Sequence, residues 1–240
     1  SDVVLAARGG YGASDLLPRL DWTKLKAARP KLIVGFSDIS ALHSAVYAKL
    51  GWPGLHAPMP ATTLWRKEGT GADVDALLAL LTKLDGKSEL SHAMAVTAVK
   101  AAPTRAVEGK LFGGCFTVLT NLIGTPYFPA NLAGHILFIE DTDEHPARLM
   151  RALNQWLQTG VLKDVKALVV GYLRGLGDKT PDCAPFVYQQ FAARTEIPVF
   201  STPLFGHTSP NFPLMVGGDA VIEGPTLTWR LPRSGIRSEE

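Results

Sequence analysis

The chain has 240 residues, of which 46% are hydrophobic and 19% charged, a balance typical of globular domains. Its formal net charge of +2, without a dense run of Lys and Arg, argues against nucleic acid as the main partner. The sequence contains no run of about 18 apolar residues, the length needed to span a membrane. The two cysteines, Cys115 and Cys183, are too few for a disulfide framework and favour the reducing cytoplasm.

The first fifty residues predict two strand–loop–helix units. An apolar run at residues 3–7 indicates a short buried parallel strand, followed by a glycine loop and a helix over residues 13–20. Residues 32–34 indicate a second strand, and residues 38–50 a second helix that Gly51 would cap. Two successive units predict a parallel α/β layer with both loops at the carboxyl ends of strands, where such sheets bind ligands.

The later part of the chain has a different pattern. Residues 53–60 contain three prolines and predict a loop, and residues 73–84 predict an amphipathic helix that connects two domains. The other predicted strands cover residues 95–100, 104–111, 136–139 and 167–172, the other predicted helices cover residues 116–123, 146–159 and 185–194, and short strands separated by Gly and Pro turns fill residues 199–229.

These elements predict an α/β protein with two domains. Residues 1–65 would form an N-terminal parallel α/β domain of the flavodoxin or amidotransferase type, and residues 66–97 a connecting segment with one helix. Residues 98–240 would form a C-terminal α/β domain with a mixed sheet. Because the chain begins directly on a strand, it starts in mid-fold, and we expect a native segment, with or without a leader peptide, to precede Ser1.

The turn at Ser37 is the most informative motif. Gly35-Phe36-Ser37-Asp38 follows an apolar strand and precedes a helix, so it would display a hydroxyl above a helix N-terminus, where developing negative charge is stabilised. That position suits a nucleophile. A helix N-cap is the alternative role for Ser37, and Ile39 stands where a complete Gly-x-Ser-x-Gly elbow has its last glycine.

A nucleophilic serine needs a base and an acid that orients the base. His207 lies in a loop rich in Gly and Pro after a predicted strand, where a base could be presented, although loop histidines are also commonly solvated. Glu140 and Asp141 end a buried strand and Glu144 follows them, and carboxylates there are costly unless paired. Any of the three could orient His207 or cap the following helix, and His56 could line the site without taking part in the chemistry.

Two further glycine motifs precede predicted helices. Gly9-Gly10-Tyr11-Gly12 could form a nest of backbone N–H groups for an oxyanion, or simply a tight turn with positive φ angles. Its spacing is not that of a dinucleotide-binding loop. Gly113-Gly114-Cys115-Phe116 offers a rival nucleophile, because a helix N-terminus would lower the pKa of the Cys115 thiol, although a buried structural cysteine fits the sequence as well.

Taken together, these segments resemble the LD-carboxypeptidase family of serine peptidases. The matches run in order along nearly the whole chain. They are Ala7-Arg8-Gly9-Gly10-Tyr11-Gly12, Gly35-Phe36-Ser37-Asp38-Ile39-Ser40, His56-Ala57-Pro58-Met59, Gly109-Lys110-Leu111-Phe112-Gly113-Gly114, Ile136-Leu137-Phe138-Ile139-Glu140-Asp141 with Glu144 and Arg151, and Gly206-His207-Thr208 with Asn211. The chain departs from the family at Cys115, where relatives often have asparagine. It also lacks the strand–helix unit that usually precedes the Gly-Gly-Tyr-Gly loop in the family, so the resemblance implies a first domain without its first strand–helix unit.

The resemblance implies a role for each candidate residue. Ser37 would be the nucleophile and His207 the general base, and Glu140, rather than Asp141 or Glu144, would be the acid that orients the base. The serine would come from the first domain, and the base and the acid from the second, so that the site lies between them.

The resemblance also implies an oxyanion hole and a reaction. The backbone N–H of Asp38 and that of Gly9 or Gly10 would bind the oxyanion. The enzyme would be a serine-type LD-carboxypeptidase that releases a C-terminal D-amino acid, usually D-alanine, from peptidoglycan tetrapeptides during cell-wall recycling in the cytoplasm. The implied partner is a small peptide, with neither nucleic acid nor membrane, and a homodimer is expected because relatives are often dimers. No metal or cofactor is required.

Three alternative functions are consistent with the same sequence. Some relatives of the implied family instead hydrolyse a peptide–nucleotide antibiotic and so detoxify it, with the same catalytic residues. A Cys115-dependent enzyme of the amidotransferase type would use the second glycine motif. A peptide-binding module without activity would keep the fold and lose the chemistry.

Overall fold

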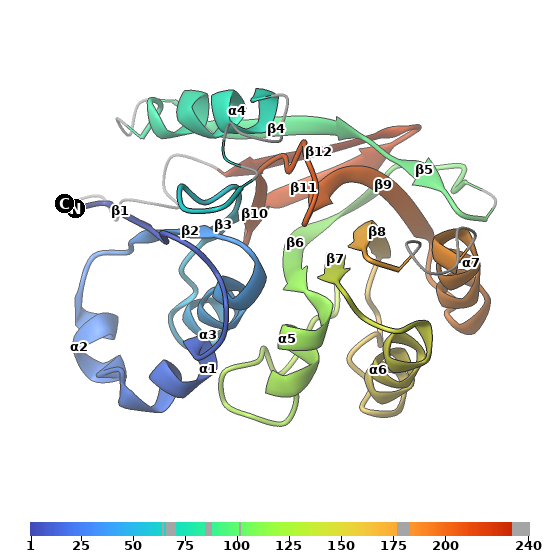
Figure 1. The fold of residues 1–240 in the computed structure, drawn as a ribbon, viewed down its shortest axis with the longest axis horizontal. Coiled ribbons are helices and arrows are strands. Elements are labelled where there is room, and N and C mark those ends of the chain that lie inside the picture. Colours follow the sequence, from blue (N-terminus) through green and yellow to red (C-terminus); the bar gives the residue numbers. More distant parts are fainter. Residues whose placement is uncertain (64, 66–70, 85–87, 101, 177–182, 232–240) are drawn as a thin grey trace.

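The computed structural model describes residues 1–63, 65, 71–84, 88–100, 102–176 and 183–231, and it contains two β-sheets (Figure 1). The smaller sheet has the strand order β1-β2-β3-β10. Its strands are β1 (Val3–Leu5), β2 (Leu32–Gly35), β3 (Gly54–His56) and β10 (Leu214–Val216). The first three run parallel, which the sequence predicts for β1 and β2 only, and β10 joins β3 antiparallel.

Two predictions about this sheet are wrong. Strand β1 is parallel but not buried, because it lies at the edge of the sheet, where Val4 and Leu5 are exposed. The loop predicted for residues 53–60 contains the buried strand β3. The three prolines of this segment lie outside residues 54–56. Residues 54–56 therefore keep the backbone N–H groups that form hydrogen bonds with neighbouring strands.

The larger sheet has the strand order β4-β12-β11-β6-β7-β8-β9-β5. Its strands are β4 (Leu90–Ala95), β5 (Thr97–Ala98), β6 (Val107–Cys115), β7 (His135–Thr142), β8 (Ala167–Arg174), β9 (Val199–Gly206), β11 (Asp219–Glu223) and β12 (Thr226–Leu231). Strands β6 to β9 run parallel and the outer strands pair antiparallel, which confirms the mixed sheet. The strand predicted at residues 95–100 is displaced toward β4 and the short β5, and the one predicted at 104–111 runs on to Cys115.

The α-helices are α1 (Ala13–Leu16), α2 (Trp22–Ala27), α3 (Ser40–Leu50), α4 (Ala72–Leu81), α5 (Phe116–Leu122), α6 (Pro146–Gln158) and α7 (Cys183–Arg194), and the 3₁₀ helices are η1 (Leu17–Arg19) and η2 (Ser37–Ile39). The predicted helix over residues 13–20 changes to η1 at Leu17, because Pro18 lacks the N–H that an α-helix interior needs. Helix α2 was not predicted. The left-handed C-cap at Gly51 is confirmed, with φ 68°.

Helices α5, α6 and α7 lie together on one side of the parallel strands β6 to β9 (Figure 1). Their shared core is aromatic: the ring centroid of Phe116 lies 4.9 Å from that of Trp156 and 5.8 Å from that of Phe191. The Trp156 Nε1–H donates to Thr120 Oγ1 at 2.9 Å, so the buried indole keeps a hydrogen-bond partner. This packing fixes the carboxyl ends of the strands.

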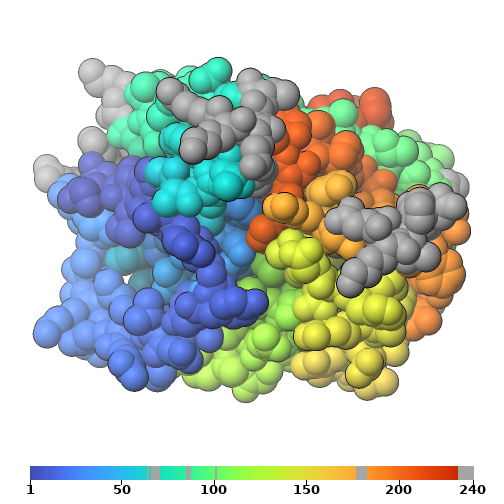
Figure 2. Space-filling view, viewed as in Figure 1, coloured from blue at the N-terminus to red at the C-terminus, as the bar shows by residue number. Residues whose placement is uncertain are grey.

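The two sheets belong to neighbouring parts of the molecule, and the later part of the chain supplies one strand of the smaller sheet. In Figure 2 the N-terminal residues form one side of the visible face and meet the later residues along a continuous boundary. Strand β10 lies within the range predicted for the second domain, yet it completes the first sheet, with Leu214 opposite His56. The domain boundaries at residues 65 and 97 stay a prediction. Among the described residues, no helix combines the length and apolar character needed to cross a bilayer.

Close approach of two strands requires glycine at position 113. A Cβ at Gly113 would overlap the carbonyl oxygen of Phe138 in β7. We expect Gly113→Ala to lower the free energy of unfolding by about 3 kcal/mol, as in overpacked cores, measured by urea denaturation. Gly160→Ala is the matched control, since its Cβ meets open space and only its φ of 76° is unfavourable, at about 1 kcal/mol. Equal losses in the two variants would contradict the close approach.

Candidate active site

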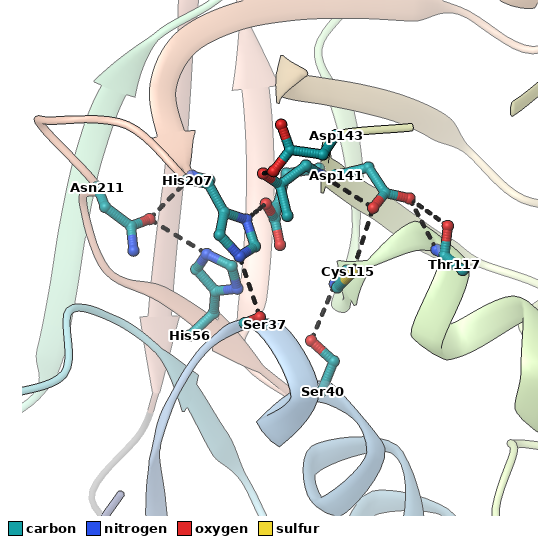
Figure 3. Close-up of polar contacts among 12 residues, drawn as sticks. Ser37, Ser40, His56, Cys115, Thr117, Asp141, Asp143, His207 and Asn211 are labelled. Atoms are coloured by element: carbon teal, nitrogen blue, oxygen red, sulfur yellow. Dashed lines mark hydrogen bonds and ion pairs between the residues drawn. The ribbon is translucent and has the colours of Figure 1, made fainter. Parts of the chain in front are cut away.

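Ser37 lies on a strained turn directly after β2. It is the first residue of η2 and has a φ of 62°, which is uncommon for a residue other than glycine. Phe36 is the N-cap residue of this helix and makes no side-chain capping bond, so Ser37 does not have the N-cap role considered as its alternative. The turn instead directs the Ser37 hydroxyl toward a histidine from the other end of the chain (Figure 3).

The structure brings together the serine, histidine and glutamate that the sequence suggested (Figure 3). The His207 Nδ1–H donates to Glu140 Oε2 at 2.6 Å, and His207 Nε2 accepts from the Ser37 hydroxyl at 3.0 Å. Ser37 follows β2, Glu140 lies in β7, and His207 follows β9, so each stands at or near the carboxyl end of a parallel strand. This order of contacts is that of a nucleophile, a base and an orienting acid.

Burial and charge affect the pKa values of the pair in opposite ways. Burial lowers the pKa of His207, but the charge of Glu140 and the hydrogen bond to it outweigh burial and raise that pKa above 6.5. Burial raises the pKa of Glu140, but the charge of His207 and the hydrogen bond with it outweigh burial and hold that pKa below 4.5. Glu140 is fully buried, so its charge acts on His207 with little screening by water.

The glycine loop at residues 9–12 lies against the serine turn. A Cβ at Gly9 would come within 2.9 Å of Ser37 Cβ and 3.5 Å of Asp38 N, so only glycine fits there. The Asp38 carboxylate accepts from Ala13 N at 2.9 Å and thereby ties the end of this loop to the serine turn. Gly10 and Gly12 have positive φ angles, so the tight turn considered for this loop is present beside Ser37.

A pocket of about 360 Å³ opens beside Ser37. The glycine loop with the exposed Tyr11 forms one wall, and the carboxyl ends of β6 and β7 with the start of α5 form another. The pocket is lined by the carboxylates of Asp38, Asp141 and Glu144, and Arg148 Nε donates to Glu144 Oε2 at 2.9 Å. Within the described residues, no group of three His, Cys, Asp or Glu side chains could hold a metal ion.

Cys115 lines this pocket but is not an activated thiol. Burial raises its pKa well above the usual 9.0, and the charges of Glu140 and Asp141 raise it further. The prediction that a helix N-terminus lowers the pKa of Cys115 is therefore wrong, because burial and the two nearby carboxylates raise that pKa instead. The Cys115 thiol donates to Asp141 at 3.6 Å, and its backbone N–H donates to Ser40 Oγ at 2.9 Å (Figure 3).

Asp141 and Glu144 are not partners of the histidine. Asp141 accepts from the backbone N–H of Thr117 at 2.9 Å and from its hydroxyl at 2.6 Å, and so caps α5. Burial raises the pKa of Asp141 to about 6. The geometry therefore selects Glu140 among the three carboxylates that the sequence left open.

Three buried polar residues next to the site were missed or only partly foreseen. His56 was expected to line the site, and it lies buried below His207 in Figure 3. Asn211, named only within the resemblance, is buried between His56 and the loop of His207. In the sequence, Asp73 is an ordinary acidic residue in the first turn of a helix. In the structure it is fully buried, and its carboxylate accepts a hydrogen bond from Asn211 N at 2.7 Å. Only contacts across the fold reveal that role.

Comparison with known protein families identifies both parts of the chain. Residues 1–57 match the LD-carboxypeptidase N-terminal domain, and residues 108–222 match the LD-carboxypeptidase C-terminal domain. The murein tetrapeptide carboxypeptidase of Pseudomonas aeruginosa is 32% identical over 94% of this chain and 74% of its own length.

Solved structures show the same fold. The crystal structure of muramoyltetrapeptide carboxypeptidase from Oxalobacter formigenes has a TM-score of 0.79 and 33% identity, over 96% of this chain and 77% of that one. An MccF-like protein from Bacillus anthracis has a TM-score of 0.80 and 25% identity, over 95% of this chain and 76% of that one. With both domain models and these relatives in agreement, the chain belongs to the LD-carboxypeptidase family.

Proposed function

We propose that this protein is a serine carboxypeptidase that cleaves the amide between an L-centre and a C-terminal D-amino acid, releasing D-alanine from peptidoglycan tetrapeptides. The observation that carries the proposal is the continuous hydrogen-bonded chain from Ser37 through His207 to Glu140. The similarity to the murein tetrapeptide carboxypeptidase of Pseudomonas aeruginosa supports the choice of substrate.

The proposed mechanism follows from the direction of these hydrogen bonds. His207 Nε2 takes the proton of the Ser37 hydroxyl as Oγ attacks the scissile carbonyl. Glu140 holds Nδ1–H and stabilises the imidazolium that forms. The imidazolium then donates its proton to the leaving amine of D-alanine. Water, activated by the same base, hydrolyses the acyl-enzyme and restores Ser37.

The oxyanion is proposed to bind at the backbone of the serine turn and the glycine loop. Asp38 is the second residue of η2, where a backbone N–H has no partner within the helix. The approach of Gly9 to Ser37 brings the loop, with the Gly9 and Gly10 N–H groups, to the same side of the nucleophile. Each such donor contributes about 3 kcal/mol to lowering the barrier.

Location and assembly belong to the same proposal. A role in recycling cell-wall peptides inside the cytoplasm suits the free thiols of Cys115 and Cys183. A homodimer stays a prediction.

A stereochemical substrate panel tests the proposal. The protein is incubated with muropeptide tetrapeptide ending in D-alanine, with the same peptide ending in L-alanine, and with aspartyl sulfamoyl adenosine, the compound bound to an MccF protein of the same fold. We expect release of D-alanine alone, measured by mass spectrometry. Hydrolysis of the adenosine conjugate without D-alanine release would instead support the antibiotic-detoxifying alternative, and binding of the tetrapeptide without release of either product would support the peptide-binding module.

The pH dependence of the reaction follows from the pKa of His207. The base must be neutral to accept the proton, and interaction with Glu140 raises its pKa above 6.5. We therefore expect kcat/KM for the tetrapeptide to rise with pH and to reach half its maximum above pH 6.5. A pH–rate series with wild-type protein checks this, and a midpoint well below 6.5 would contradict the ionised Glu140–His207 pair.

A further inference from the structure

We propose that Asn211 is a positioning residue for this reaction, whose side-chain carbonyl holds the backbone before His207 against β3, the strand paired with the one that leads into Ser37. The inference rests on the proposed function and adds a residue that does not touch the reacting atoms. Asn211 is 1% exposed and lies to the left of His207 in Figure 3, away from the Ser37 hydroxyl.

The carbonyl oxygen of Asn211 accepts two hydrogen bonds from different parts of the fold. The backbone N–H of Gly206 donates to it at 2.9 Å, and His56 Nε2–H donates to it at 3.2 Å. Gly206 directly precedes His207 and ends β9 of the larger sheet, whereas His56 ends β3 of the smaller sheet. One oxygen therefore links the two sheets immediately beside the base.

The backbone of Gly206 has little freedom to move on its other side. Its φ is 113°, and a Cβ there would lie 2.9 Å from Glu140 Cβ and 3.0 Å from the Tyr172 carbonyl oxygen. Asn211 on one side and Glu140 on the other thus confine Gly206, the residue directly before the base. Loss of the Asn211 bond would free the Gly206 N–H and allow the imidazole to shift from Ser37.

His56 connects Asn211 to the nucleophile. It pairs with Gly35 in the parallel register of β2 and β3, and Ser37 follows Gly35 by two residues. The His56 ring packs against the rings of Phe36, Phe138 and Phe205, with centroids 5.5 to 6.0 Å away. A shift of Asn211 would therefore displace both the backbone before His207 and the strand that leads to Ser37.

A second buried contact holds Asn211 itself. Its backbone N–H donates to Asp73 Oδ2 at 2.7 Å, and Asp73 is fully buried at the start of α4. The backbone N–H of Phe212 donates to the Leu204 carbonyl at 2.8 Å and closes the loop that carries His207. The hydrogen bond of its backbone N–H thus holds Asn211 in place, so that its side-chain oxygen can position Gly206 and His56.

Substitution by leucine and by aspartate separates positioning from packing. Asn211→Leu keeps a similar volume and removes the acceptor, so we expect kcat to fall about 10²-fold, the effect of a displacement near 1 Å, with KM almost unchanged. Asn211→Asp keeps the oxygen that accepts from Gly206 and His56, so we expect it to recover most of the lost kcat at high pH. Asn131→Leu, at an exposed loop residue whose Oδ1 accepts from Ala133 N, is the matched control and should behave as wild type.

The aspartate variant also carries a signature that packing alone cannot produce. The titratable groups facing His56 are Glu140, His207 and the buried His43, and burial holds the His56 pKa at about 4. A carboxylate at position 211 adds negative charge beside this cluster. The midpoint of the kcat/KM profile should therefore move to higher pH than in wild type.

The rate at which a fluorophosphonate labels Ser37 measures the nucleophile independently of the peptide. Slow labelling of Asn211→Leu, normal labelling of Asn131→Leu and recovery in Asn211→Asp would support positioning, even if the wild type released no D-alanine and the proposed function failed. Wild-type labelling and kcat in Asn211→Leu would overturn the inference. If Asn211→Leu does not fold, Asn211→Asp provides the test. The inference would be overturned if the fluorophosphonate labelled Asn211→Asp no faster than unfolded protein, or if the midpoint of its kcat/KM profile did not move to higher pH.

Discussion

Replacement of Ser37 by alanine is expected to remove D-alanine release, with kcat lower by about 10⁶-fold. The variant loses the only atom of the chain of hydrogen bonds that can form the acyl-enzyme, while His207 and Glu140 remain paired. Because Ser37 is on a turn with φ 62°, alanine keeps the same backbone strain, so the fold should be retained. Steady-state release from the tetrapeptide and a thermal melt measure the two effects.

Cys115→Ala is the control for this result. The thiol is buried, its pKa is well above 9.0, and it lies in the same pocket, so its removal should leave kcat close to wild type. The amidotransferase-like alternative predicts the reverse pattern. Activity in Ser37→Ala together with loss in Cys115→Ala would therefore reject the serine mechanism.

Glu140→Gln is expected to have the second largest effect, with kcat lower by about 10⁴-fold. Glutamine has nearly the same shape, but it carries no charge and can present its NH₂ group to His207 Nδ1, which selects the wrong tautomer. Without the carboxylate, burial dominates at His207 and lowers its pKa. The midpoint of the residual kcat/KM profile should therefore fall, which a pH–rate series or histidine NMR titration would measure.

Asp141→Asn tests whether Glu140 is the orienting acid. Asp141 lies next to Glu140 in β7 and also raises the pKa of His207, but it makes its hydrogen bonds to Thr117 and Thr142 instead. We expect a smaller shift of the midpoint and a much smaller loss of kcat than in Glu140→Gln. A loss in Asp141→Asn as large as that in Glu140→Gln would contradict the assignment.

The sequence predicted the parts of the fold that depend on local patterns. The parallel strands, the helices at residues 40–50 and 146–158 and the Gly51 cap follow from apolar periodicity and from glycine conformations. Strand β3 was missed because its burial comes from pairing with β2 and with β10, which lies about 160 residues later. The exposure of β1 was missed for the same reason, since its place at an edge depends on the order of strands.

The site was predicted to a different extent at each residue. Ser37 stood out because a strand, a glycine and a helix start coincide there. Residue patterns alone could not choose among Glu140, Asp141 and Glu144, and the resemblance to a family made that choice before the geometry did. The sequence placed His56 near the site but gave no sign of its contact with Asn211, and the buried Asp73 gave no local signal, because these partners lie far away in the chain.

The pairing of β10 with β3 sets the order in which the protein can mature on the ribosome. The serine turn leaves the exit tunnel early, but the first sheet acquires its fourth strand only after Val216 has been translated, on the order of 10 s later at usual elongation rates. His207 also belongs to this late segment. A nascent chain that stalls before residue 207 therefore presents Ser37 without its histidine, and hydrolytic competence can arise only after His207 has been translated.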